Sequence, residues 1–180
     1  EIVFEHMDKL GLMMHVITQE TEHDHLLDGG ELGPERKLYY RELIARFSHH
    51  PALVWNLGEE NTNTPGQLKA FAAYIRELDP YDHAIVVHSY PNVHWKYRVY
   101  KPLIGFEHFE GPSVQLHYDE CHEIVKSLIA ESAKAGHQWF VCTDESGSAR
   151  QGMDPDDRKN SKDDPLGPNN QGRLRQNVLW

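Results

Sequence analysis

The chain has 180 residues, 39% of them hydrophobic and 26% charged, which is the composition of a globular domain with a sizeable core rather than of a disordered chain. Its 18 basic and 28 acidic residues give a formal net charge of −10, which argues against nucleic acid or an anionic membrane as a partner. A neutral ligand such as a sugar is compatible with this charge. The only cysteines, Cys121 and Cys142, indicate neither a disulfide framework nor a zinc cluster, so we expect two free thiols.

Segments with the period of an amphipathic helix alternate along the chain with short apolar segments typical of buried strands. The helix signals are an apolar face over 3–10 that stops at Gly11, a start at Pro34 with a stop at 49–51, a capping box at 64–67, a short helix over 95–100, and a helix capped by Asp119 that ends at Gly136. The predicted strands are 12–18, 52–57, 84–87, 114–117 and 139–143. Polar loops occupy 19–33 and 146–170, and a further helix begins near Arg173.

This alternation predicts an α/β fold with a parallel sheet, either an open doubly wound sheet or part of an eight-stranded barrel. Polar residues follow every strand: Gln19 and Glu20, Glu59 to Asn61, His88 and Tyr90, His117 and Tyr118, and Asp144 and Glu145. A ring of polar strand ends is typical of a barrel, whereas an open sheet concentrates function at one switch point. A glycine-rich phosphate loop after the first strand is also missing, which favours the barrel.

Two of the predicted strands end in adjacent carboxylates, Glu59 with Glu60 and Asp144 with Glu145. The chemistry that most needs two facing carboxyl groups is glycoside hydrolysis, in which one protonates the leaving oxygen and the other attacks the anomeric carbon or activates water. In a regular strand, neighbouring side chains point to opposite faces, so periodicity alone does not choose one member of each pair. An acidic pair that caps a helix or faces solvent is the alternative.

The motif Trp55-Asn-Leu-Gly-Glu-Glu60 resembles the end of strand four in the large clan of retaining (β/α)8 glycosidases, with Glu59 where asparagine is usual. Glu145-Ser-Gly147 resembles the Glu-x-Gly that ends strand seven in the same clan. Most of the chain also resembles bacterial glycoside hydrolases that carry an N-terminal β-sandwich domain of unknown function.

The resemblance implies that Glu60 is the general acid/base and Glu145 the nucleophile of a retaining O-glycosyl hydrolase that acts on a poly- or oligosaccharide. It implies one catalytic domain over 1–180, running from about helix two to the start of helix seven of a partial (β/α)8 barrel. Strands one, two and eight would then lie outside the chain, which would leave strand edges open and favour association. The implied sugar-binding residues are Gln19, Glu59, Asn61, His88, Tyr90, His117, Tyr118 and Asp144.

No cofactor or metal is expected for this chemistry, and the partners would be the carbohydrate and accessory β-sandwich domains. An extracellular or periplasmic location suits a bacterial enzyme of polysaccharide degradation. Two alternatives stay open. One is a metal-dependent barrel hydrolase that uses His15, Glu20, His23, His25, Glu107, His108 or His117, although no His-x-x-x-His helix site occurs. The other is a catalytically silent carbohydrate-binding barrel, to which the aromatic residues Trp95, Tyr97 and Tyr100 would contribute stacking.

Overall fold

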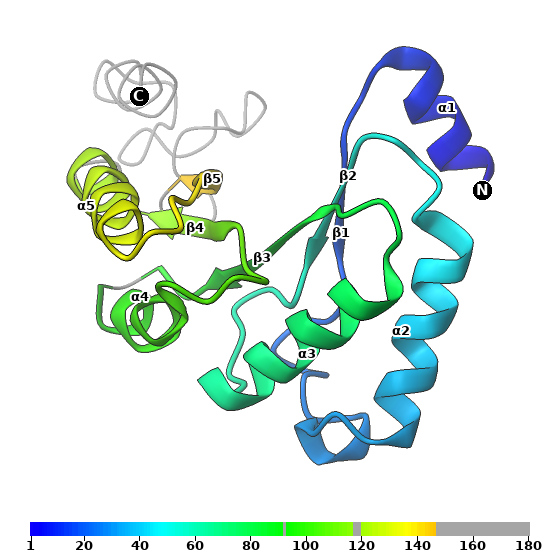
Figure 1. Cartoon of the computed structure of the whole chain (residues 1–180), viewed down its shortest axis with the longest axis horizontal. Coiled ribbons are helices and arrows are strands. Elements are labelled where there is room, and N and C mark those ends of the chain that lie inside the picture. The colour runs from blue at the N-terminus through cyan, green and yellow to red at the C-terminus, as the bar shows by residue number, and fades with distance from the viewer. Residues whose placement is uncertain (92, 117–119, 147–180) are drawn as a thin grey trace, which may run out of the picture.

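The computed structural model describes residues 1–91, 93–116 and 120–146, and within them it is an α/β fold (Figure 1). The α-helices are α1 Ile2–Leu10, α2 Pro34–Phe47, α3 Pro65–Leu78, α4 Val93–Tyr100 and α5 Cys121–Lys134. Two short 3-10 helices are η1 Asp28–Gly30 and η2 Lys101–Leu103. The strands are β1 Met14–Ile17, β2 Leu53–Asn56, β3 Ala84–Ser89, β4 Gly111–Leu116 and β5 Cys142–Ser146.

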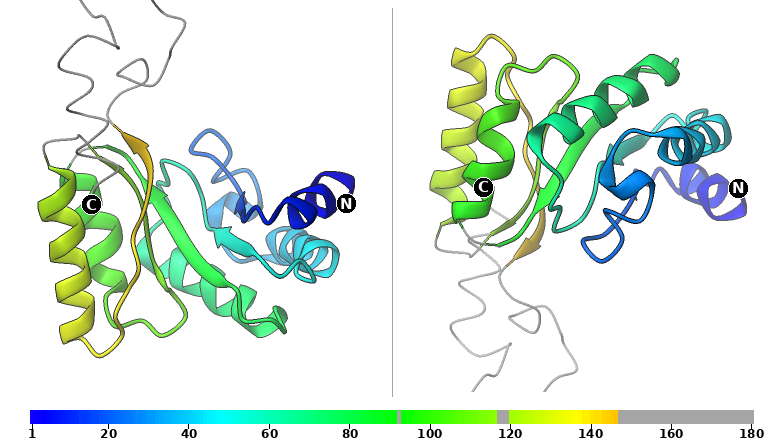
Figure 2. Two further views of the ribbon diagram at one scale, coloured as in Figure 1. Left: turned by 90° about the horizontal axis from the view of Figure 1, so that it is seen from above. Right: turned by 90° about the horizontal axis from the view of Figure 1, so that it is seen from below.

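The five strands form one parallel sheet in the order β1-β2-β3-β4-β5, so each strand pairs with its neighbours in sequence. The sheet curls into a half-barrel, and α2, α3, α4 and α5 lie along its outer face (Figure 2). The predicted alternation of helices with a parallel sheet is therefore confirmed. Because parallel strands run in one direction, all five C-terminal ends meet at the same rim of the sheet.

The hydrophobic core lies between the outer face of the sheet and the helices. Leu53, Trp55 and Leu57 of the β2 region alternate toward this side and pack with Tyr40 of α2 and Phe71 of α3, all nearly inaccessible to water. The intervening residues face the concave side, and toward the C-terminal rim several of them are polar: His15, Asn56, His88, Ser113 and Gln115. A parallel strand covered on both faces is normally apolar throughout, so these buried polar side chains need partners on the concave face.

Local sequence signals explain several element boundaries. The Thr64 hydroxyl accepts a hydrogen bond from the Gln67 backbone N–H, and the Gln67 side chain accepts one from the Thr64 N–H, which completes the predicted capping box at the start of α3. Gly11 adopts the left-handed conformation (φ 68°) that ends α1, also as predicted. Cys121 and Cys142 are both free thiols.

The prediction for the last strand was wrong in its bounds, because β5 begins at Cys142 rather than at Trp139. The Trp139 N–H donates to the Ser132 hydroxyl of α5 and its indole ring packs edge-on against Phe109. These contacts hold Trp139 against α5 and outside the hydrogen-bonded sheet. The strand therefore runs over Cys142–Ser146, and Asp144 and Glu145 lie inside β5 rather than after it. The predicted cap Asp119, the loop over 147–170 and the helix from Arg173 lie outside the described residues.

None of the described helices has both the length and the apolar character that a membrane crossing requires.

Candidate functional site

The loops that follow β1, β2 and β3 are joined to one another at the C-terminal rim. The Glu59 N–H donates to the Gln19 carbonyl (3.0 Å), and the Asn61 N–H donates to the His88 carbonyl (3.3 Å). A hydrogen bond of 2.8 Å joins the hydroxyls of Thr21 and Tyr90. The structure thus brings the polar residues after three successive strands into one continuous surface, as parallel topology requires.

Glu60 occupies the turn between β2 and α3 with φ of 43°, a left-handed conformation that is unusual for a residue with a side chain. Burial raises the pKa of the Glu60 carboxyl, and the negative charge of Glu145 raises it further, while His88 opposes the shift. Glu60 and Glu145 are far apart in sequence, and the parallel sheet brings the end of β2 and the end of β5 to the same rim. A carboxyl with a raised pKa can retain a proton and donate it.

The Asp144 carboxylate contacts side chains from three other strands on the concave face. Its Oδ2 accepts a hydrogen bond from the Ser113 hydroxyl and lies 3.5 Å from His15 Nδ1 and 3.9 Å from His88 Nδ1. Burial alone would raise the pKa of Asp144, but the hydrogen bonds from His88 and Ser113 and the charges of His15 and His88 outweigh it, so the pKa is lowered. Asp144 is therefore a persistent negative charge beside Glu145.

A polar chain crosses the concave face and orients these groups. Asn56 Nδ2 donates to His15 Nε2 (3.1 Å) and approaches the Ser113 hydroxyl (3.4 Å). Because His15 Nε2 accepts, its protonated Nδ1 faces Asp144. His15, Asn56 and Ser113 were not predicted as members of this site. His15 and Asn56 are each a polar residue inside an otherwise apolar predicted strand, and this pattern could have indicated a site. Ser113 gave no such signal, because it lies outside the strand predicted over 114–117.

His88 of β3 lies between the two carboxylates of β5. Its Nδ1 is 3.3 Å from the Ser113 hydroxyl, and its Nε2 is 3.8 Å from Glu145 Oε2. The ring is almost fully buried, and Nε2 makes no hydrogen bond within the described residues. His88 is therefore placed to contact both Asp144 and Glu145 from a fixed position in the sheet.

Asp144 and Glu145 both lie near His88, which strict alternation along a strand would not allow. The pairing of β4 with β5 shifts register between Val114 and Gln115, so that Val114 pairs with Thr143 and Gln115 with Glu145. Asp144 is the extra residue of this β-bulge, and such a bulge changes the direction of a side chain. The expectation that neighbouring carboxylates point to opposite faces holds for a regular strand, and β5 is not regular at this point.

Two predicted sugar-binding residues are engaged within the protein. The Gln19 side chain accepts from the buried guanidinium of Arg36 and donates to Asn63 (2.6 Å). Asn61 is fully buried. Its side-chain Nδ2 donates to Asn63 Oδ1, and its Oδ1 accepts a hydrogen bond from the Asn63 backbone N–H. Their amides hold the loops after β1 and β2 together. His117 and Tyr118 lie outside the described residues, as does Gly147 of the Glu-x-Gly motif, and nothing is described of the Trp95 side chain.

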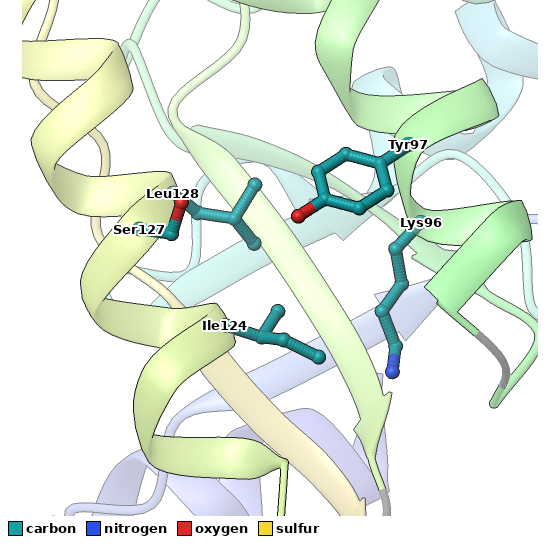
Figure 3. A pocket seen from close by; sticks show the side chains of 5 residues that line it. All are labelled: Lys96, Tyr97, Ile124, Ser127 and Leu128. Carbon is teal, nitrogen blue, oxygen red and sulfur yellow. The ribbon is translucent and has the colours of Figure 1, made fainter.

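An open cleft of about 620 Å³ lies at the end of β1, and Glu60, Asp144 and Glu145 are not among the residues that line it. Its lining comes from β1 and the loop after it, with one ring from α2: Ile17, Thr18, Gln19, Glu20, His23, Leu26, Leu27 and Tyr39. Its size is in the range of small-molecule sites, and its lining combines apolar and hydrogen-bonding groups. A second hollow between α4 and α5, lined by Lys96, Tyr97, Ile124, Ser127 and Leu128, measures about 10 Å³ and has room for one water (Figure 3).

The histidine pair considered for metal binding in the loop after β1 does not converge. His23 lies with Glu20 and Glu22, their ligand atoms within 4.8 Å of one another and all three residues exposed. His25 instead contacts the Gly29 carbonyl and the Thr62 hydroxyl, each at 3.2 Å.

Searches of this chain against protein-family models, curated proteins and solved structures found no match.

The coupling between the two glutamates gives a prediction that needs no substrate. In Glu145→Gln, the pKa of Glu60 is expected to fall, because one of the two main causes of its elevation is the charge of Glu145. Titration of the Glu60 carboxyl carbon by ¹³C NMR measures this shift. Glu123→Gln, which removes an exposed carboxylate on α5, is the control and should leave the titration unchanged. An unaltered Glu60 titration in Glu145→Gln would show that the carboxyl groups do not interact.

Proposed function

We propose that this protein is a retaining glycoside hydrolase with Glu60 as the general acid/base and Glu145 as the nucleophile. The observation that carries the proposal is geometric: the loop that holds Glu60 is hydrogen-bonded to the His88 carbonyl through the Asn61 N–H, and the His88 ring lies 3.8 Å from the Glu145 carboxylate. In addition, burial and the charge of Glu145 raise the pKa of Glu60, which favours a protonated Glu60 beside a negative Glu145. Glycoside hydrolysis needs such a division between a protonated and an ionised carboxyl group. The resemblance of the Trp55 to Glu60 and Glu145 to Gly147 motifs to those of barrel glycosidases supports the same assignment.

In the first step, the Glu145 carboxylate attacks the anomeric carbon while Glu60 donates its proton to the glycosidic oxygen, and the leaving sugar departs with that proton. In the second step, the ionised Glu60 takes a proton from water, the resulting hydroxide attacks the anomeric carbon, and the bond to Glu145 breaks. The second attack restores the original anomeric configuration. Glu60 ends the cycle protonated and Glu145 ends it ionised.

The neighbouring residues have distinct tasks in this scheme. Asp144 and His88 form a fixed frame beside Glu145, since both contact Ser113 in the sheet. Asp144 keeps its charge at the pH values where Glu60 is protonated, because its pKa is lowered. Glu20 and Glu59, whose backbones pair at the rim, and Tyr90, whose hydroxyl is bonded to that of Thr21, would supply hydrogen bonds to sugar hydroxyls. The half-barrel would be part of an eight-stranded barrel, in which the C-terminal rim is the usual place for an active site.

The test is hydrolysis of a panel of nitrophenyl α- and β-glycosides and of polysaccharides, followed by ¹H NMR of the first-formed product. Release of sugar with the anomeric configuration of the substrate is expected from a covalent intermediate. Initial release of the opposite anomer would replace the nucleophile role with that of a general base that activates water. Binding of oligosaccharides without turnover by the purified chain would contradict the enzymatic assignment and favour a carbohydrate-binding domain.

The proposed acid also sets the pH dependence. Activity is expected to fall on the alkaline side with an apparent pKa above the ordinary glutamate value, because Glu60 must be protonated and burial with the Glu145 charge raises its pKa. The measurement is kcat/KM against pH on a substrate with a poor leaving group. A substrate whose leaving group needs no protonation is the control, since its alkaline limb should weaken or disappear.

A further inference from the structure

A second cluster of potential ligands lies away from the carboxylates, where the start of α1 meets the connection between α2 and β2 (Figure 1). Its members are Glu1, His49 and His50, and their ligand atoms all lie within 4.8 Å of one another. Glu1 Oε2 is 3.8 Å from His50 Nε2 and 3.9 Å from His49 Nε2. In the sequence, His49 and His50 had been interpreted only as the end of a helix.

His50 offers a buried nitrogen that is suited to bind a ligand. Its side chain is 1% exposed, and its Nδ1 donates to Asp8 Oδ2 at 2.6 Å. A neutral imidazole that donates from Nδ1 presents a lone pair at Nε2. Nε2 of His50 is buried, makes no hydrogen bond within the described residues, and faces the Glu1 carboxylate. A buried acceptor without a partner is costly, and a ligand at this position would satisfy it.

We propose that Glu1, His49 and His50 bind a divalent transition-metal ion of the zinc type, with Asp8 as the carboxylate that orients His50. Imidazole and carboxylate groups are zinc ligands, at about 2.0 to 2.2 Å from the metal. A tetrahedral ion with such bonds separates its ligand atoms by about 3.3 Å. The two distances from Glu1 exceed this by about half an ångström, and the exposed side chains of Glu1 and His49 have the freedom to move toward an ion. An Asp–His pair behind a metal ligand is the usual arrangement for fixing its tautomer.

The surroundings indicate a structural role for the ion. Helix α1 has no fully buried residue, and Phe4 is its main contact, with its ring 4.7 Å from that of Phe47 and 5.2 Å from that of His50. An ion held by Glu1 on one side and the two histidines on the other would fasten α1 to the end of α2. The exposed group of Glu20, Glu22 and His23 has no comparable buried nitrogen, so the proposal does not extend to it.

The experiment is titration of the metal-free chain with Zn²⁺ by calorimetry and with Co²⁺ by visible absorption, followed by thermal unfolding with and without Zn²⁺. One ion per chain is expected. His49→Ala and Glu1→Gln should each weaken binding by about tenfold or more, and Asp8→Asn by about 10- to 100-fold. His6→Ala, which removes an exposed histidine of α1, is the matched control and should bind as the parent chain does.

Zn²⁺ should raise the melting temperature of the parent chain and of His6→Ala but not that of His49→Ala. Unchanged affinity in both His49→Ala and Glu1→Gln would overturn the proposal, as would loss of binding in His23→Ala, which would place the ion in the exposed group instead. None of these measurements depends on glycosidase activity.

Discussion

If Glu60 and Glu145 have the proposed catalytic roles, replacing either of them is expected to abolish most activity, but in ways that differ with the substrate. Glu60→Gln should lower kcat by about 10²- to 10⁴-fold on substrates with poor leaving groups and much less on nitrophenyl glycosides, whose leaving group needs no proton. Glu145→Gln should lower kcat by about 10⁴-fold or more on both, because no covalent intermediate forms. Steady-state kinetics with matched pairs of substrates measures the difference.

Azide distinguishes the two roles further. When added to Glu145→Ala, it should restore turnover of an activated glycoside and give a glycosyl azide of inverted configuration, because azide then attacks in place of the nucleophile. When added to Glu60→Ala, it should give the retained glycosyl azide. Glu123→Gln is the control for a lost surface carboxylate. An inverted azide product from Asp144→Ala rather than from Glu145→Ala would transfer the nucleophile role to Asp144.

The largest expected effect on stability comes from Gly111→Ala at the start of β4. A methyl group there would overlap the backbone carbonyl oxygen of Phe140, which precedes β5 and cannot move without displacing the sheet. We expect a loss of about 3 kcal/mol in the free energy of unfolding, measured by urea denaturation. Because β4 and β5 carry Ser113 and Asp144, glycosidase activity should fall as well.

Gly66→Ala provides the matched comparison for a glycine substitution. An added Cβ at Gly66 would have only the Thr64 hydroxyl nearby, at 3.9 Å, and the residue lies in the first turn of α3. This change should stabilise the protein by about 0.5 kcal/mol through the reduced entropy of the unfolded chain. Equal unfolding midpoints for the two variants would contradict the contact between Gly111 and Phe140.

Those features of the fold that depend on local sequence were predictable. The capping box at Thr64 and Gln67 and the stop at Gly11 each involve residues within one helical turn, and apolar periodicity indicated α1, α2, α3 and α5. The short helix α4, predicted over 95–100 in an irregular aromatic region, begins at Val93. Alternation of helices and strands then predicted the parallel sheet. The start of β5 was missed because Trp139 is held by Ser132 and Phe109, contacts that no local pattern encodes.

The candidate site was predictable in its carboxylates but not in the frame that holds them. Glu60 and Glu145 stand out in the sequence because each follows an apolar run. The partners of Asp144 come from three other strands: His15 from β1, His88 from β3 and Ser113 from β4. The bulge that turns Asp144 toward them arises from the pairing of β4 with β5, and a single sequence does not reveal such a register shift. Electrostatic coupling between Glu60 and Glu145 likewise depends on the curl of the sheet.

The order β1-β2-β3-β4-β5 has a consequence for how the chain reaches its native state. Every strand finds its hydrogen-bonding partner in the strand that emerged just before it, so a growing chain can add one strand and one helix at a time to an existing edge during synthesis. No strand has to be inserted between two that are already paired. Each pairing joins two strands that are separated by one α-helix and its connections, so each step closes a single β-α-β loop.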